Sequence, residues 1–246
     1  MILEFFRAIV YQPLFNGLVL LYEHVSFEDL GLAIIFLTIA VRVVLFPLFH
    51  KTAKHQKISQ ELQPKVKEIR KKYKDDKEAQ TKALMDLYKD NQIHPLTPIL
   101  LLILQMPVLF SLYRIFINGF SNGALDMLYS FVPAPEHINQ TLLGIVTLSE
   151  VSIPLVIAAA IAQYIQGVLV SSKSRSQKGA ANGQAQKMAK LGIFMGPAMA
   201  LIILLRFPAA VALYWLTSTI FSIIQQIIIN HSMSKEKEKK MENEQT

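Results

Sequence analysis

The feature that most constrains this chain is the apolar run GLAIIFLTIAVRVVLFPLFH, which extends from Gly31 to His50 and contains one arginine, Arg42. Twenty helical residues rise about 30 Å, which is the thickness of the hydrocarbon core of a bilayer. Arg42 lies about 17 Å from the Gly31 end, past the middle of such a span. An ionisable group at that depth is costly and by default marks a functional site. The alternative is that Arg42 extends its guanidinium along the helix to the lipid headgroups.

The composition is that of a membrane protein. Of the 246 residues, 52% are hydrophobic and 17% are charged, and the hydrophobic residues gather in long runs. The chain has no cysteine, which excludes disulfides, thiol nucleophiles and cysteine-ligated metals. Its six histidines form no HxxH or HExxH pattern, so we expect neither a metal nor a cofactor. We attribute the net charge of +7 to membrane topology and to lipid headgroups.

Hydropathy predicts an all-α multi-pass membrane protein with five transmembrane helices. The spans are expected at residues 31–50, 95–117, 153–170, 191–207 and 208–230. Residues 1–30 are apolar but carry polar interruptions, and we expect an amphipathic helix on the extracytoplasmic membrane surface. A spanning helix is the alternative for residues 1–25. The tail, residues 231–246, is rich in Lys and Glu and is expected to be disordered.

Residues 51–94 predict a helical hairpin between the first and second spans. They hold twelve Lys or Arg and seven Asp or Glu, and they carry two apolar stripes at helical spacing. We expect Pro64 to kink or restart the first helix, and Asp75 or Asp76 to cap the second. Two amphipathic helices joined by a tight polar turn close with stripe against stripe.

The distribution of Lys and Arg predicts the orientation. Segments 51–94 and 171–190 carry twelve and five of the 25 Lys and Arg residues, whereas segment 118–152 carries none. The positive-inside bias therefore places the N-terminus outside, and the hairpin, the tail and segment 171–190 in the cytoplasm. Segment 171–190 is also rich in Gly, Ala, Ser and Gln, which is typical of a flexible loop.

Polar side chains inside the predicted spans are candidates for a site around Arg42. They are Thr38, Gln105, Tyr113, Gln163, Gln166, Tyr214, Trp215, Thr217, Ser218, Gln225 and Gln226. Taken singly, such residues are mostly hydrogen-bonding glue between helices or interface anchors. The five spans contain no Asp or Glu, so Arg42 has no carboxylate partner there. An unpaired buried cation is very costly, so we expect a wet polar concavity that opens to the cytoplasm and favours an anionic guest.

An enzyme is not expected. The spans offer no nucleophile–base pair, no paired carboxylates and no Gly-rich phosphate loop. One function that remains open is a small transporter or channel that binds an anionic solute through Arg42. No repeat between the two halves of the chain supports this alternative.

From Tyr11 onward the chain resembles the YidC/Oxa/Alb family of membrane protein insertases. The matching blocks are TIAVRVVLFPL (38–48), LQPKVKEIRKKY (62–73), LYKDNQIHPL (87–96), LLILQMPVLFSLYRIF (101–116) and LLRFPAAVALYWLTSTIFSIIQQIII (204–229). The resemblance implies a five-helix core with a cytoplasmic hairpin in the bacterial cell (inner) membrane. It implies insertion and folding of nascent membrane proteins without nucleotide hydrolysis, through a hydrophilic groove open to cytoplasm and lipid.

The expected groove residues are Arg42, Thr38, Gln105, Gln163, Gln166, Tyr214 and Trp215. By the resemblance, Arg42 is the groove arginine and Thr38 its neighbouring threonine. Gln166 is the groove glutamine, with Gln163 in its place if the register slips by one turn. Trp215, beside Tyr214, is the aromatic residue of the last helix. The apolar segment of the inserted protein is expected to leave along residues 153–170 and 208–230.

The resemblance also implies partners. They are nascent membrane proteins and membrane lipids, with the Sec translocon, the ribosome and the signal recognition particle receptor as further candidates; no specific nucleic acid is expected. The chain lacks the extracytoplasmic domain and the lipoprotein cysteine that many members carry, so we expect a minimal form. Its tail, with four Lys and four Glu, does not match the long basic extension that some members use on ribosomes. The hairpin is either a structural device or the place where partners and clients, the proteins to be inserted, are captured. After the insertase and the transporter, a third functional alternative is a chaperone that folds membrane proteins without inserting them.

Overall fold

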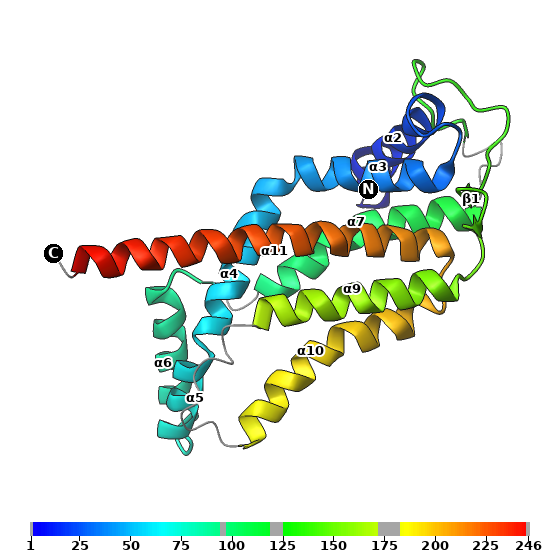
Figure 1. The fold of residues 1–246 in the computed structure, drawn as a ribbon. Helices are drawn as coiled ribbons and strands as arrows, with labels where there is room; N and C mark the ends of the chain where they lie inside the picture. The colour runs from blue at the N-terminus through cyan, green and yellow to red at the C-terminus, as the bar shows by residue number, and fades with distance from the viewer. Residues whose placement is uncertain (1, 94–96, 119–124, 172–182, 245–246) are drawn as a thin grey trace.

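The architecture was taken from a computed structural model of the chain, which describes residues 2–93, 97–118, 125–171 and 183–244. Its long helices lie along one direction, and helix α11 (Ala209–Glu244) occupies the middle of the molecule (Figure 1). It packs against α3 (Leu30–Val44), α7 (Thr97–Asn118) and α9 (Ile153–Ser171), while α10 (Gly183–Leu204) packs mainly on α9. Side chains on different faces of α11 can therefore point to α3, α7 or α9.

Several of these helices are long and apolar enough to cross a membrane. Within the described ranges they are Glu4–His24, Ile153–Val170 and Ala209–Ser232, and the bent pair Leu30–Val44 and Phe46–Ser59 adds a fourth candidate. A shorter apolar stretch, Ile193–Leu204, lies in α10. This arrangement agrees with the predicted helical membrane protein.

The predicted span 31–50 is not one straight helix. Helix α3 ends at Val44, and α4 (Phe46–Glu61) leaves it at an angle of 73°. Pro47 accounts for the break, because it has no N–H for the carbonyl of Val43 and its ring crowds that carbonyl. Arg42 consequently lies on the last turn of α3, and α4 passes α7 and α11 on its way to the hairpin.

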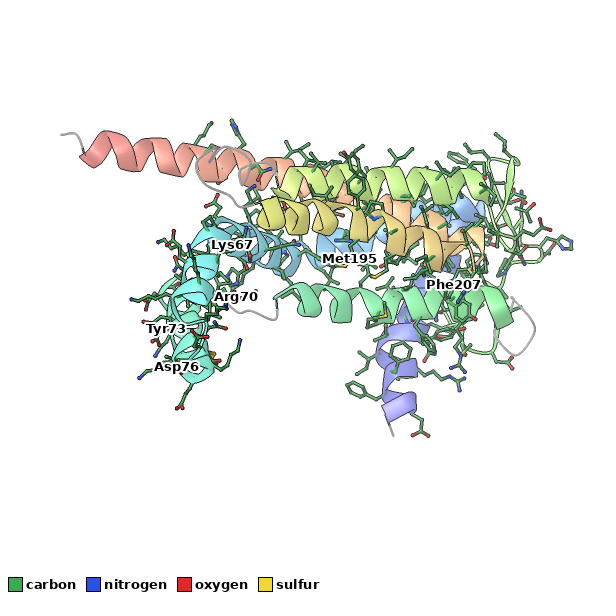
Figure 2. All side chains as sticks on the ribbon, turned by 90° about the horizontal axis from the view of Figure 1, so that it is seen from below. Lys67, Arg70, Tyr73, Asp76, Met195 and Phe207 are labelled. Carbon is green, nitrogen blue, oxygen red and sulfur yellow. The ribbon has the colours of Figure 1, made fainter. Side chains whose placement is uncertain are left out.

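The described residues 51–93 form a helical hairpin. Helix α5 (Gln63–Lys72) begins anew with Pro64 in its first turn, and α6 (Lys77–Asp90) returns beside it. Of the two predicted caps, Asp76 is the one used, since its Oδ1 accepts a hydrogen bond from the Ala79 N–H at 2.9 Å. Figure 2 shows the hairpin, labelled at Lys67, Arg70, Tyr73 and Asp76, standing to one side of the long helices.

Two predicted boundaries are wrong because helices extend beyond them. Helix α10 begins at Gly183, so residues 183–190 of the predicted flexible loop are helical, whereas residues 172–182 lie outside the described ranges. Helix α11 continues through the predicted disordered tail to Glu244. Lys, Glu and Met are strong helix formers, and Glu236 and Lys240 stand in the favourable i, i+4 order.

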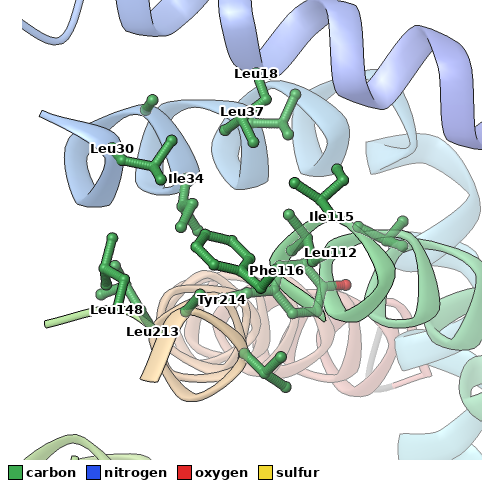
Figure 3. Packing of buried hydrophobic residues seen from close by; sticks show 14 of the residues in the cluster. Leu18, Leu30, Ile34, Leu37, Leu112, Ile115, Phe116, Leu148, Leu213 and Tyr214 are labelled. Atoms are coloured by element: carbon green, nitrogen blue, oxygen red, sulfur yellow. The ribbon is translucent and has the colours of Figure 1, made fainter. Parts of the chain in front are cut away.

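The N-terminal segment is helical and belongs to the core. It comprises α1 (Ile2–Phe6), the π-helical turn η1 (Arg7–Tyr11) and α2 (Gln12–His24). Phe15, Leu18 and Tyr22 are buried, and Leu18 faces α3 in the cluster drawn in Figure 3. That the segment lies on the membrane surface stays a prediction. Its length would allow it to span a membrane, but Figure 2 shows it running across the direction of the long helices, which agrees better with a helix on the surface.

The end of the bundle opposite the hairpin carries a small antiparallel sheet that the sequence analysis did not predict. Strands β1 (Thr141–Leu142) and β2 (Val146–Thr147) pair there, and β1 crosses α3 at Gly31. A Cβ on Gly31 would come within 2.8 Å of the Leu142 backbone, so the crossing requires glycine. Asp29 caps α3 through the Leu32 N–H at 2.8 Å and accepts from the Leu143 N–H at 2.5 Å.

The hairpin is joined to the bundle by a buried lysine, Lys57 of α4. Its side chain is 2% exposed, and Nζ donates to the carbonyl of Val170 at 3.0 Å. That carbonyl lies in the last turn of α9, where carbonyls lack helical partners and the helix dipole favours a cation. Asn230 of α11 donates to the neighbouring carbonyl of Leu169 at 3.2 Å. The end of α9 is thus held from both α4 and α11.

We expect Lys57→Met to loosen the root of the hairpin. The substitution keeps the length of the side chain but removes the charged donor, which should lower the free energy of unfolding by about 1–3 kcal/mol. Hydrogen exchange of the amides in α4 and α5 should rise in the purified protein, and Lys57→Arg should retain much of the protection. Lys51→Met, at an exposed position of the same helix, is the matched control; equal exchange in both Met variants would contradict a clamp at Lys57.

Candidate functional site

The guanidinium of Arg42 points into the helix bundle. Arg42 is 7% exposed, although it lies in a helix whose other face carries exposed apolar residues such as Val43. Its Nε donates to Ser218 Oγ at 2.9 Å, and its Nη2 donates to Gln105 Oε1 at 3.2 Å and also to Ser218 Oγ. The side chain therefore ties the end of α3 to α7 and α11. This geometry does not match an arginine that extends along its own helix to the headgroups.

Gln105 and Tyr214 complete a neutral network around this cation. Gln105 Nε2 donates to the Tyr214 hydroxyl at 2.6 Å and to Ser218 Oγ at 3.1 Å. Ser218 is 2% exposed and Tyr214 3%. We call these four residues, Arg42, Gln105, Tyr214 and Ser218, the arginine cluster. Every hydrogen-bond partner of Arg42 in it is a neutral group, so no described residue of the cluster compensates its positive charge.

A phenylalanine covers one face of the guanidinium. Cζ of Arg42 lies 4.1 Å from the centre of the Phe49 ring, on the first turns of α4. Such a cation–π contact contributes about 0.5–2 kcal/mol, most where both groups are removed from water. The bend after Val44 makes this contact, because it returns α4 to the side of α3 that carries Arg42.

The hydrogen bonds of Arg42 leave part of its donor capacity open. Within the described residues they use Nε and Nη2, whereas a guanidinium also carries two N–H groups on Nη1. A planar pair of donors beside a fixed positive charge suits a carboxylate or another oxygen-bearing anion. The arginine cluster can therefore bind an acidic guest without losing its own hydrogen bonds.

Thr38 lies one turn before Arg42 but is not joined to it by a hydrogen bond. It is 2% exposed, and its hydroxyl donates to the carbonyl of Ile34 in its own helix at 2.6 Å. Its position beside the cluster agrees with the prediction that it shares a helix face with Arg42. Its hydroxyl hydrogen is already used within α3.

The predicted glutamines lie on the other side of α11. Gln163 Oε1 accepts from the Thr219 hydroxyl at 3.1 Å, and Gln166 is half-buried one turn further along α9. Thr219 also donates to the carbonyl of Trp215, a half-buried residue, at 2.8 Å. Since Ser218 and Thr219 are adjacent on a helix, they face different neighbours. Of the seven predicted groove residues, the hydrogen bonds gather Arg42, Gln105 and Tyr214.

Sequence reasoning missed two residues of this site. Ser218 was counted among the polar residues of the spans but was not selected, although it bonds to both Arg42 and Gln105. Its spacing of four residues from Tyr214 was the available signal, because such residues share a helix face. Phe49 could be placed under Arg42 only with knowledge of the bend in the chain.

An apolar groove runs beside α9, away from the arginine cluster. Its volume is about 350 Å³, and the side chains that line it include Ile157, Ile161, Tyr164, Phe194, Pro197 and Leu201. Helices α9 and α10, which form the groove, touch closely near Gly196 of α10, where an added Cβ would lie 3.1 Å from the side chain of Gln163 of α9. The accessible surface of the groove is apolar, which suits contact with lipid or with an apolar helix.

Comparison with known proteins gives one consistent family. The family model described as 60Kd inner membrane protein matches residues 20–237. The membrane protein insertase YidC of Geobacter metallireducens is 30% identical over 92% of this chain, which spans 38% of that protein. The YidC proteins of Oceanobacillus iheyensis and Clostridium perfringens are 32% and 30% identical, over 85% and 86% of this chain and 78% and 82% of their own lengths.

The matched residues 20–237 include the complete hairpin and the helices that carry the arginine cluster. These helices are α3, α7 and α11, of which only the last turns of α11 lie outside the match. The chain therefore belongs to the 60Kd inner membrane protein family, in which the YidC insertases are its relatives, and it is a multi-pass protein of the bacterial inner membrane.

Proposed function

We propose that the chain is an insertase, which places nascent membrane proteins in the bilayer and assists their folding without nucleotide hydrolysis. The names of its relatives support this proposal. The observation that carries it is the arginine cluster, in which a buried guanidinium is held, among the described residues, by neutral groups. A fixed positive charge with open donors, inside a bundle of apolar helices, suits transient binding of a polar segment in transit.

We propose an orientation with the hairpin in the cytoplasm. Segments 51–94 and 171–190 carry seventeen of the 25 Lys and Arg residues, and segment 118–152 carries none. The arginine cluster lies at the end of α3 that continues into the hairpin, so a client would reach it from the cytoplasm. Capture of the client, and docking of the Sec translocon, the ribosome or the signal recognition particle receptor, are roles that we assign to the exposed face of the hairpin.

The arginine cluster would lower the cost of moving an acidic tail. A single Asp at the centre of a membrane helix costs roughly 2.5–3.5 kcal/mol on insertion scales. Hydrogen bonds to a charged partner contribute about 1.5–3 kcal/mol each. Binding of the tail carboxylate to the open Nη1 donors of Arg42 therefore offsets much of this cost at the point where the tail leaves water. A polar groove that reaches Arg42 would shorten the distance over which the tail must cross the hydrocarbon core without water.

The apolar segment of the client would leave along exposed isoleucines. On α9 these include Ile153, Ile157 and Ile161, which follow at steps of four residues, and on α11 they include Ile220 and Ile224. Residues at this spacing form stripes along a helix. Transfer of the client helix from these stripes to lipid is driven by its own hydrophobic surface.

The purified protein in lipid vesicles should by itself promote insertion of a short single-span client with an acidic tail. Because hydrophobic partition and Arg42 supply the free energy, insertion should not need a nucleotide. The measurement is protection of the client tail from added protease, compared with vesicles that lack the protein.

The same vesicles separate the competing functions. A transporter or channel for an anionic solute would give solute flux while the client tail stays open to protease. A chaperone that folds without inserting would protect only clients already in the bilayer. Either result would overturn the insertase proposal.

Arg42→Ala should slow insertion of a client with an acidic tail about tenfold, since loss of one charged hydrogen bond corresponds to roughly 1.4 kcal/mol or more. A client with a neutral tail should be affected far less. Arg42→Lys should restore part of the rate, because it keeps the charge but not the fork of the guanidinium. Initial rates of tail protection are the measurement.

Arg206→Ala is the control for a general loss of charge. Arg206 is exposed and lies between α10 and α11, away from the arginine cluster. We expect its substitution to leave both clients unaffected. Equal slowing of acidic and neutral tails by Arg42→Ala would mean that Arg42 serves only to hold the helices together.

A further inference from the structure

Two buried side-chain atoms lack a hydrogen-bond partner in the described part of the chain. They are Nε2 of Gln225, on α11, and Nδ1 of His50, on α4. Gln225 is 3% exposed. Polar groups removed from water are almost always hydrogen-bonded, and an unpaired one is most costly in a membrane-spanning segment. A buried amide that is kept without a partner therefore points to a ligand.

The two residues belong to the parts of α4 and α11 that meet through Phe46 and Phe221. The His50 ring stacks on Phe46 with 5.5 Å between ring centres, and Phe46 meets Phe221 of α11 at 6.5 Å. Gln225 follows Phe221 by four residues, so it lies one turn further on the same face of α11. Figure 1 shows α4 passing α11 in this region, and α4 and α11 are in contact.

This crossing continues the arginine cluster. Phe49, the neighbour of His50 in the chain, lies against the Arg42 guanidinium. On α11, Tyr214, Ser218 and Gln225 follow at steps of four and seven residues, which keeps them on one helix face. Ser218 and Gln225 are therefore about 10 Å apart along the axis of α11.

The chemistry of these atoms favours oxygen-bearing ligands. Gln225 Nε2 is a donor, and His50 Nδ1 donates or accepts according to its tautomer. Peptide carbonyls and the side chains of Asp, Glu, Asn or Gln offer suitable oxygens. An extended peptide rises about 3.3 Å per residue, so about three residues separate two contacts 10 Å apart.

We propose that Gln225 and His50 form a second contact for the client tail, and that they hold a peptide or side-chain oxygen about three residues from the residue held by Arg42. The proposal rests on the insertase function and extends it. Arg42 selects charge, whereas the second contact is neutral and fixes the register of an extended polar segment.

Cysteine crosslinking tests this register directly, because the chain contains no cysteine of its own. Full-length variants Ser218→Cys and Gln225→Cys are each combined with stalled clients that carry one cysteine at successive positions of an acidic tail. After mild oxidation, we expect the strongest disulfide from Gln225→Cys about three client residues away from that of Ser218→Cys. Ile224→Cys, at a position that is 54% exposed on the outer face of α11, is the control.

The outcomes separate the two proposals. Crosslinking of Gln225→Cys that is no stronger than that of Ile224→Cys, or that peaks at the same client position as Ser218→Cys, overturns the second contact. Labelling of Gln225→Cys by a small water-soluble thiol reagent without crosslinking to the client would assign the crossing to water alone and would also overturn it. If Ser218→Cys fails to crosslink as well, the insertase proposal fails with it.

A second variant avoids dependence on cysteine. Gln225→Leu removes the amide at similar volume, and we expect it to slow insertion of a polar tail about fivefold while the protein accumulates normally. Gln226→Leu is the matched control, since Gln226 Nε2 already donates to Asn230 Oδ1 at 3.2 Å. Equal rates for wild type and Gln225→Leu would mean that the amide is merely buried, and would overturn the proposal.

Discussion

The arrangement of this protein depends on one buried cation, Arg42, that has no anion beside it among the residues that the structure describes. Helices α3 and α7 contain no carboxylate, and α11 contains none before Glu236, so these three helices offer Arg42 no salt bridge within the bundle. Ser218, Gln105 and the ring of Phe49 hold the guanidinium by dipoles and by a π face. These groups fix the position of the charge but do not neutralise it. The same property that makes the site costly makes it attractive to a negatively charged segment.

Helix α11 allows this site to coexist with a tightly packed bundle. Two of its faces meet different neighbours, since Ser218 turns to α3 and α7 and Thr219 bonds to Gln163 of α9. A third face, at Ile224, is exposed. Its first N–H groups are also satisfied by the loop opposite the hairpin, since Ala209 and Ala210 donate to the carbonyls of Glu150 and Leu148 at 2.6 and 3.0 Å. The polar residues of the arginine cluster and the exposed apolar residues therefore lie on separate faces of α11.

Much of the fold could be predicted from sequence because it follows from local rules. Hydropathy located α9 to within one residue, and Pro64 and Asp76 marked the start of α5 and the cap of α6. The failures have physical causes. Pro47 ended α3 within an apolar run that hydropathy reads as continuous, and favourable Lys and Glu spacing extended α11 beyond the membrane segment.

The site could be predicted less completely than the fold. Arg42 was evident because a charge in an apolar run is rare, and Gln105 and Tyr214 were reasonable partners. Ser218 is small and common in membrane helices, so only the three-dimensional arrangement reveals that it bonds to two members of the site. Gln163 and Arg42 could not be assigned to opposite sides of α11 from sequence, because helix rotation depends on packing.

The two hydrogen bonds at the end of α9 differ in kind, and this difference distinguishes how α9 is attached to α4 and to α11. Lys57 holds the Val170 carbonyl with a charged donor, whereas Asn230 holds the Leu169 carbonyl with a neutral one. Charge-assisted hydrogen bonds are about twice as strong as neutral ones. At this end, α9 is therefore joined to α4 mainly by one charge-assisted hydrogen bond, whereas its attachment to α11 combines a neutral hydrogen bond with extensive packing. A displacement of the hairpin root would reach α9 through a single side chain, Lys57.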